Sequence, residues 1–105
     1  MLFALNGKVA VVTGAGSLRG IGRSIAIALA TQGAKVAICD INEEGLFKVA
    51  EEIKQRTSEV MIVTMSVTDG TSIREGFASV VDKWGKIDIL VNNAGITQPV
   101  TVAEM

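Results

Sequence analysis

Four glycines follow directly on a short apolar run near the start of the chain. They are Gly14, Gly16, Gly20 and Gly22, and a helical pattern begins after them. Glycines let a backbone turn tightly and approach a ligand closely, while the free N–H groups and dipole of a helix N-terminus favour an anion. A glycine-rich turn alone is as often structural, but this order predicts a phosphate-binding loop. The candidate cofactor-binding residues of the loop are Gly14, Gly16, Ser17, Arg19, Gly20, Ile21 and Gly22.

A carboxylate follows at a distance typical of dinucleotide sites. Asp40 lies 20 residues after Gly20, at the end of the next apolar run. There it could accept both ribose hydroxyls of an adenine dinucleotide, although a solvated strand end or a helix cap is the structural alternative. Arg19 could pair with the 2′-phosphate of NADP, whereas Asp40 would repel that phosphate at close range. We therefore expect NAD to be preferred, with NADP possible through Arg19.

The elements that must position these residues alternate along the chain. Apolar, β-branched runs predict strands over 8–13, 35–40, 60–65 and 87–92. Helical spacing predicts helices over 20–32, from Asn42 onward and over 69–84. This order predicts an α/β fold, a Rossmann-like doubly wound parallel sheet of four strands in the order 3-2-1-4, incomplete on its C-terminal side. The ligand crevice would lie between the first and fourth strands.

Each predicted helix has one side that would face the sheet. In the first helix this side holds Ile21, Ile25, Ala28, Leu29 and Gln32. The second has an apolar stripe of Leu46, Val49, Ala50 and Ile53, and the third has a buried stripe of Ile73, Phe77, Val80, Val81 and Trp84.

Composition excludes several classes of function. The 105 residues carry a net charge of −1 with no basic cluster, which gives no reason to expect nucleic acid or an anionic membrane as partner. No metal-ligand spacing occurs, and without histidine no Ser-His-Asp or Cys-His site can form. The single cysteine, Cys39, rules out an internal disulfide, is expected in the core, and fits a cytoplasmic setting.

Four stretches together resemble the N-terminal half of a short-chain dehydrogenase/reductase. They span 5–14, 20–23, 67–69 and 88–97, and the last, which contains Asn92-Asn93-Ala94-Gly95, is the most specific. The resemblance implies NAD(P)-dependent hydride transfer between nicotinamide and a carbonyl or alcohol carbon. It assigns Gly14, Gly20 and Gly22 to the pyrophosphate, Asp40 to the adenosine ribose, Ser66 and Val67 to the adenine, and Asn93, Ala94 and Gly95 to the cofactor between the first and fourth strands.

Three features depart from the family pattern. Five residues, not the usual three, separate Gly14 from Gly20, and Leu18-Arg19 resembles the insertion. Ser66 stands where an aspartate commonly accepts the adenine amino group. The proton donor of the family is the tyrosine of Tyr-x-x-x-Lys, and this chain has no tyrosine.

We therefore expect residues 1–105 to be the dinucleotide-binding part without the catalytic half, inactive alone and with no catalytic residue of its own. A capping box, Thr101 with Glu104, announces a helix only one residue before Met105. An open edge on the fourth strand would favour self-association or pairing with the missing C-terminal half. The alternative is a small nucleotide-binding or interaction module that does no chemistry.

Overall fold

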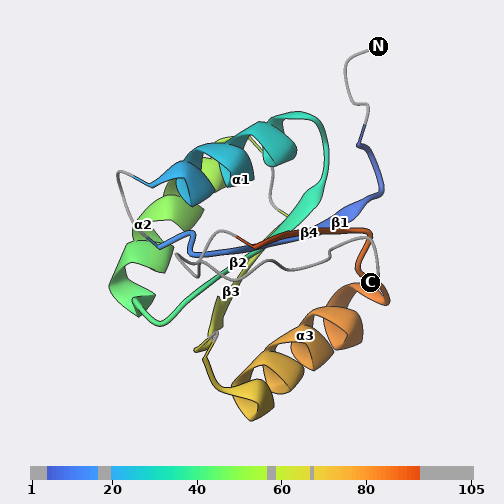
Figure 1. The fold of residues 1–105 in the computed structure, drawn as a ribbon. Helices are drawn as coiled ribbons and strands as arrows, with labels where there is room; N and C mark the ends of the chain where they lie inside the picture. The colour runs from blue at the N-terminus through green and yellow to red at the C-terminus, as the bar shows by residue number, and fades with distance from the viewer. Residues whose placement is uncertain (1–4, 17–19, 57–58, 67, 93–105) are drawn as a thin grey trace.

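A parallel sheet of four strands lies at the centre of the structure (Figure 1), a computed structural model that describes residues 5–16, 20–56, 59–66 and 68–92. Its strands are β1 (Val9–Thr13), β2 (Lys35–Asp40), β3 (Val60–Thr64) and β4 (Ile89–Asn92). They pair in the order β3-β2-β1-β4, all parallel, as predicted. The three helices are α1 (Ile21–Thr31), α2 (Glu43–Lys54) and α3 (Gly70–Trp84). The predicted elements therefore differ from the observed ones only at their ends.

The two central strands are buried on both faces, which explains their unbroken apolar sequence. Val12, Val36 and Ile38 belong to one hydrophobic cluster, whereas Val11 and Cys39 belong to another on the opposite face. Successive side chains of a strand point to opposite faces, so each run supplies both clusters. β1 and β2 consequently form the rigid base from which the loop after β1 and the carboxylate at the end of β2 project.

The helices cover the two faces unequally. α1 and α2 lie on one face and α3 lies on the other (Figure 1). The predicted stripe of α2 is confirmed, because Leu46, Val49, Ala50 and Ile53 are all buried. Asn42 caps this helix by accepting the Gly45 N–H at 3.1 Å. α2 is thus fixed both by its apolar stripe and by its N-terminal cap.

The predicted side of α1 was right for Ile25 and Leu29, which pack against the core, and wrong for Ile21, Ala28 and Gln32, which are exposed. The buried residues of this helix are Gly22, Ala26 and Ala30, whereas Ile21 is 68% exposed and Ala28 is exposed. Three small residues spaced four apart let the helix backbone lie close to its neighbours, and the larger Ile25 and Leu29 flank that line and are only partly buried. Counting large apolar residues therefore missed the true contact line.

The predicted stripe of α3 holds except at one position. Val80 is fully buried and Ile73, Phe77 and Trp84 are partly buried, but Val81 is 44% exposed.

None of the helices in the described parts of the chain is long and apolar enough to cross a bilayer.

Candidate nucleotide-binding site

The carboxyl ends of β1, β2 and β4 lie level with one another. Thr13 is in register with Cys39 on one side and with Asn92 on the other. The Thr13 hydroxyl donates to Asn92 Oδ1 at 3.0 Å, which ties the ends of β1 and β4. Gly14 follows at once with φ +69°, a left-handed conformation that favours glycine. The glycine-rich loop therefore leaves the sheet at the edge predicted for the ligand.

Asp40 is bonded directly to this loop. Its Oδ2 accepts the Gly16 N–H at 2.9 Å, and its Oδ1 accepts the Asn42 N–H at 3.1 Å. The Ala15 N–H also donates to the carbonyl of Cys39 at 3.2 Å. Each carboxylate oxygen accepts one bond and keeps a second lone pair for another donor. Asn42, not Asp40, is the residue that caps α2, so the helix-cap alternative does not apply to Asp40. The Asp40 carboxylate therefore keeps acceptor capacity for ribose hydroxyls.

The loop also packs against the first turn of α2, through a glycine that sequence reasoning missed. A Cβ atom on Gly45 would lie 1.8 Å from the carbonyl oxygen of Gly16. A Cβ atom on Gly16 would lie 3.0 Å from both the Asn42 carbonyl and the Asp40 carboxylate. A side chain at position 45 would therefore clash with the loop backbone, and one at position 16 would be tightly packed. The available signal was a glycine inside a helix, where that residue is unfavourable.

The N-terminus of α1 presents its N–H groups without a side-chain acceptor among the described residues. Gly20 is the N-cap, no side chain caps the helix there, and its first turn holds no acidic residue. Such an end favours an anion. Gly22 is buried and Ile21 is exposed beside it. The predicted Ser17 and Arg19 lie outside the described residues, as do Val67, Asn93, Ala94 and Gly95.

Ser66 follows β3 at the same edge of the sheet. The Met65 N–H before it donates to the Asp40 carbonyl at 3.0 Å. The Ser66 hydroxyl is 2.9 Å from the Thr68 hydroxyl, and the Ser66 N–H donates to Ser72 Oγ at 2.9 Å. A serine hydroxyl both donates and accepts, so it can replace the acceptor of an aspartate, although without its charge.

Cys39 is a core residue, as expected. It is 1% exposed in β2, and burial, together with the neighbouring Asp40, raises the pKa of its thiol to about 12. A thiol held neutral is a poor nucleophile, so we assign it no chemistry.

A shallow pocket elsewhere lies at the amino ends of the strands. Gly7, Lys35 and Glu59 are among its lining residues, and none of the predicted site residues is. It is therefore separate from the glycine-rich loop.

Within the described residues, no group of three or more His, Cys, Asp or Glu side chains is placed to hold a metal ion.

Comparison with known proteins identifies the family. The short chain dehydrogenase family model matches residues 8–105. The chain belongs to this family. It is 44% identical over 101 residues to the sorbitol dehydrogenase of Cereibacter sphaeroides, covering 96% of this chain and 38% of that relative. The hydroxysteroid dehydrogenase structure from Escherichia coli superposes with a TM-score of 0.82 at 41% identity, covering 90% of this chain and 40% of that one.

Two further structures in this family are described with their nucleotides. The F189W actinorhodin polyketide ketoreductase with NADPH has a TM-score of 0.79 at 39% identity, covering 93% of this chain and 37% of that one. The Brucella melitensis 3-ketoacyl-acyl-carrier-protein reductase with NADH has a TM-score of 0.75 at 37% identity, covering 83% and 34%. This short-chain dehydrogenase chain therefore spans about two fifths of the length of its relatives or less. The match confirms the predicted family and Rossmann-like fold, and does not favour a separate non-catalytic module.

Proposed function

We propose that the chain is the nucleotide-binding part of an NAD(P)-dependent oxidoreductase that moves hydride between nicotinamide and a carbonyl or alcohol carbon. The observation that carries the proposal is the bond from the Gly16 backbone to the Asp40 carboxylate. It joins the loop that we propose for the phosphates to the carboxylate that we propose for the ribose, at the carboxyl edge of a parallel sheet, where dinucleotides bind in this type of fold.

The described residues fit such a cofactor. The uncapped N-terminus of α1 would bind the pyrophosphate through backbone N–H groups, with Gly14, Gly16 and Gly20 shaping the approach. Asp40 would accept the ribose hydroxyls with its remaining lone pairs. Asn93, Ala94 and Gly95 follow β4 in the sequence and would line the cofactor between β1 and β4. The bound nicotinamide would supply or accept the hydride, while this chain binds and orients it.

We infer that NAD is preferred over NADP. The Asp40 carboxylate would face any phosphate on the adenosine ribose, and like charges at close range repel. Arg23, a described cation near the start of α1, is paired with Glu52 and is not free to compensate. Arg19 is the residue that would favour NADP, and the related structures with NADPH and with NADH fit either outcome.

The sequence holds no tyrosine, which is the proton donor of the family pattern, so we assign the proton transfer to none of its residues. A binding measurement therefore tests the proposal better than a rate. NADH and NADPH are titrated against the purified chain by the fluorescence of the reduced nicotinamide, with reduced nicotinamide mononucleotide as the control that lacks the adenosine half. We expect NADH to bind more tightly than NADPH and the mononucleotide to bind weakest. Equal, unsaturable signals for all three would contradict the proposal.

A further inference from the structure

We propose that the ion pair between Arg23 and Glu52 holds the phosphate-binding end of α1 in place, so that both are positioning residues for the nucleotide. This inference rests on the proposed function. It concerns two residues that lie 29 positions apart in the sequence and that no motif connects.

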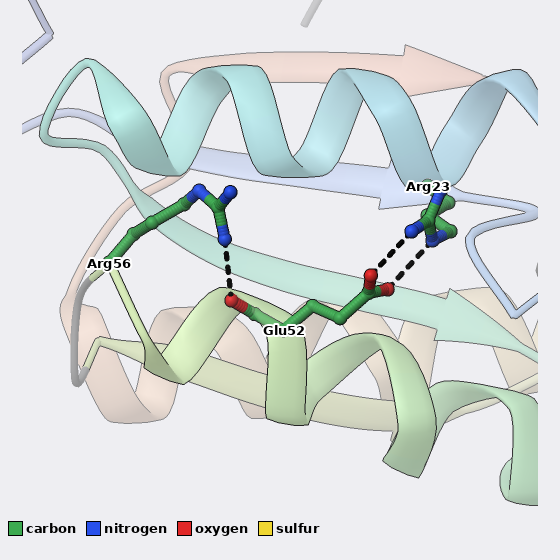
Figure 2. Close-up of polar contacts among 3 residues, drawn as sticks. All are labelled: Arg23, Glu52 and Arg56. Atoms are coloured by element: carbon green, nitrogen blue, oxygen red, sulfur yellow. Dashed lines mark hydrogen bonds and ion pairs between the residues drawn. The ribbon is translucent and has the colours of Figure 1, made fainter.

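The pair is bidentate. Arg23 Nε donates to Glu52 Oε1 at 2.7 Å, and Arg23 Nη2 donates to Glu52 Oε2 in parallel (Figure 2). Two parallel bonds between planar groups fix orientation as well as distance. Arg56, which lies beyond the end of α2, donates from Nη1 to the backbone carbonyl of Glu52 at 3.0 Å. Glu52 is therefore bonded at its carboxylate and at its backbone carbonyl.

The location of Arg23 is unfavourable for the helix that carries it. It lies in the first turn of α1, where the helix dipole favours negative charge and disfavours a cation. Glu52 offsets this cost: the hydrogen bonds that Arg23 donates to Glu52 lower the pKa of the Glu52 carboxyl and raise the pKa of the Arg23 guanidinium. Two N–H groups of the Arg23 guanidinium are already bonded to Glu52. We therefore infer that the Arg23 side chain positions the N-terminal end of α1 rather than binding phosphate.

α2 thereby holds the glycine-rich loop at both of its described ends. On one side of residues 17–19, the Gly16 carbonyl lies against Gly45 in the first turn of α2. On the other side, Arg23 in the first turn of α1 is paired with Glu52 in the last part of α2. A loop with both ends fixed loses less conformational entropy when it binds, and so binds more tightly. The Arg23–Glu52 pair supplies one of those two attachments.

The chain offers a matched control on the same helix. Glu51 is the adjacent residue, carries the same charge, and lies 4.0 Å from Lys54 in an exposed pair that does not reach α1. Glu52→Gln and Glu51→Gln therefore remove the same charge from nearly the same place. Any long-range gain from removing a negative charge near an anion is common to both variants, so their difference isolates the contact with Arg23.

The test is the dissociation constant for NADH, measured well below each variant's melting temperature. We expect Glu52→Gln to bind roughly fivefold more weakly than Glu51→Gln, the size of a modest positional coupling. A residue that only stabilised the fold would lower the melting temperature and leave the affinity of the folded protein unchanged.

The outcomes separate this inference from the proposed function. If the unmodified chain binds NADH and the two glutamine variants bind equally, the positioning role is overturned and the proposed function stands. If the unmodified chain does not bind NADH, the proposed function is overturned, and the inference that rests on it is overturned with it. Arg23→Lys is a further variant in case Glu52→Gln does not fold: it keeps the charge but lacks the fork, and full affinity in that variant would also overturn the inference.

Discussion

Gly16 and Asp40 are joined by a hydrogen bond of 2.9 Å across 24 residues of sequence. The bond runs from the loop backbone to a side chain on the neighbouring strand, so the two parts of the proposed nucleotide site are joined directly. Because the carboxylate is already oriented by Gly16 on one oxygen and by Asn42 on the other, it would need little rearrangement to accept a ribose in the proposed role. Such preorganisation lowers the entropic cost of binding.

Asp40→Ala should weaken NADH binding by about 1–3 kcal/mol, because charge-assisted hydrogen bonds to the ribose are lost. It should weaken NADPH binding less, since repulsion of the 2′-phosphate is lost too. Titration of both nucleotides gives the affinity ratio, and Asp82→Ala on α3 serves as the control for loss of a carboxylate. If the ratio stays as in the unmodified chain, Asp40 does not lie at the ribose.

Gly45→Ala should destabilise the chain by about 1–3 kcal/mol, the usual cost of overpacking, because its Cβ would lie 1.8 Å from a backbone oxygen. Gly70→Ala, in the first turn of α3, is the matched control: its Cβ would meet only the end of Arg74, at 3.7 Å, and should be neutral or mildly stabilising. Urea unfolding of both variants measures the difference. Equal stabilities would show that the loop does not pack on α2 as closely as described.

Cys39 should resist iodoacetamide at pH 8 in the folded chain and react in denaturant, because its pKa of about 12 leaves almost no thiolate. The same shift makes stability fall in alkali. Above pH 9 the unfolded thiol ionises while the folded one stays neutral, so the unfolding free energy drops by up to about 1.4 kcal/mol per pH unit, until about pH 12. Cys39→Ala should show a shallower alkaline slope. Rapid labelling of the folded chain would contradict the burial of Cys39.

Asp88 should contribute stability that is lost in acid. The Val9 N–H donates to Asp88 Oδ2 at 2.8 Å, and this bond, with Lys86 nearby, lowers the pKa of the carboxyl. The contribution is present above the ordinary value of 3.8 and disappears as the pH falls through the lower folded value. Melting temperatures of Asp88→Asn should therefore decline less steeply below pH 4 than those of Asp82→Asn. Parallel acid profiles for the two variants would exclude this role.

The sequence predicted features that depend on local patterns. Continuous apolar runs predicted β1 and β2 because such runs need cover on both faces, and the spacing from Leu46 to Ile53 predicted the buried side of α2. The contact line of α1 was missed because it consists of the small residues Gly22, Ala26 and Ala30. A search for large apolar residues does not find such a line.

Contacts between residues that lie far apart in the chain could not be predicted from the sequence. Nothing local links Gly45 to Gly16 or Glu52 to Arg23, because each pairing depends on how α2 packs against the loop and against α1. The roles of Ser17, Arg19 and Asn93 to Gly95 stay predictions, since these residues lie outside the described parts. Self-association through the β4 edge likewise stays a prediction.

The position of β1 in the sheet has a consequence for the order of synthesis. β1 pairs with β2 on one side and with β4 on the other, and Val9 meets Asp88 across 79 residues. At a translation rate of roughly 5–20 residues per second, the β4 side of β1 is without its partner for about 4–16 s on the ribosome. During that time β1, which is buried along its whole length in the folded chain, has an open backbone edge with which another strand could pair.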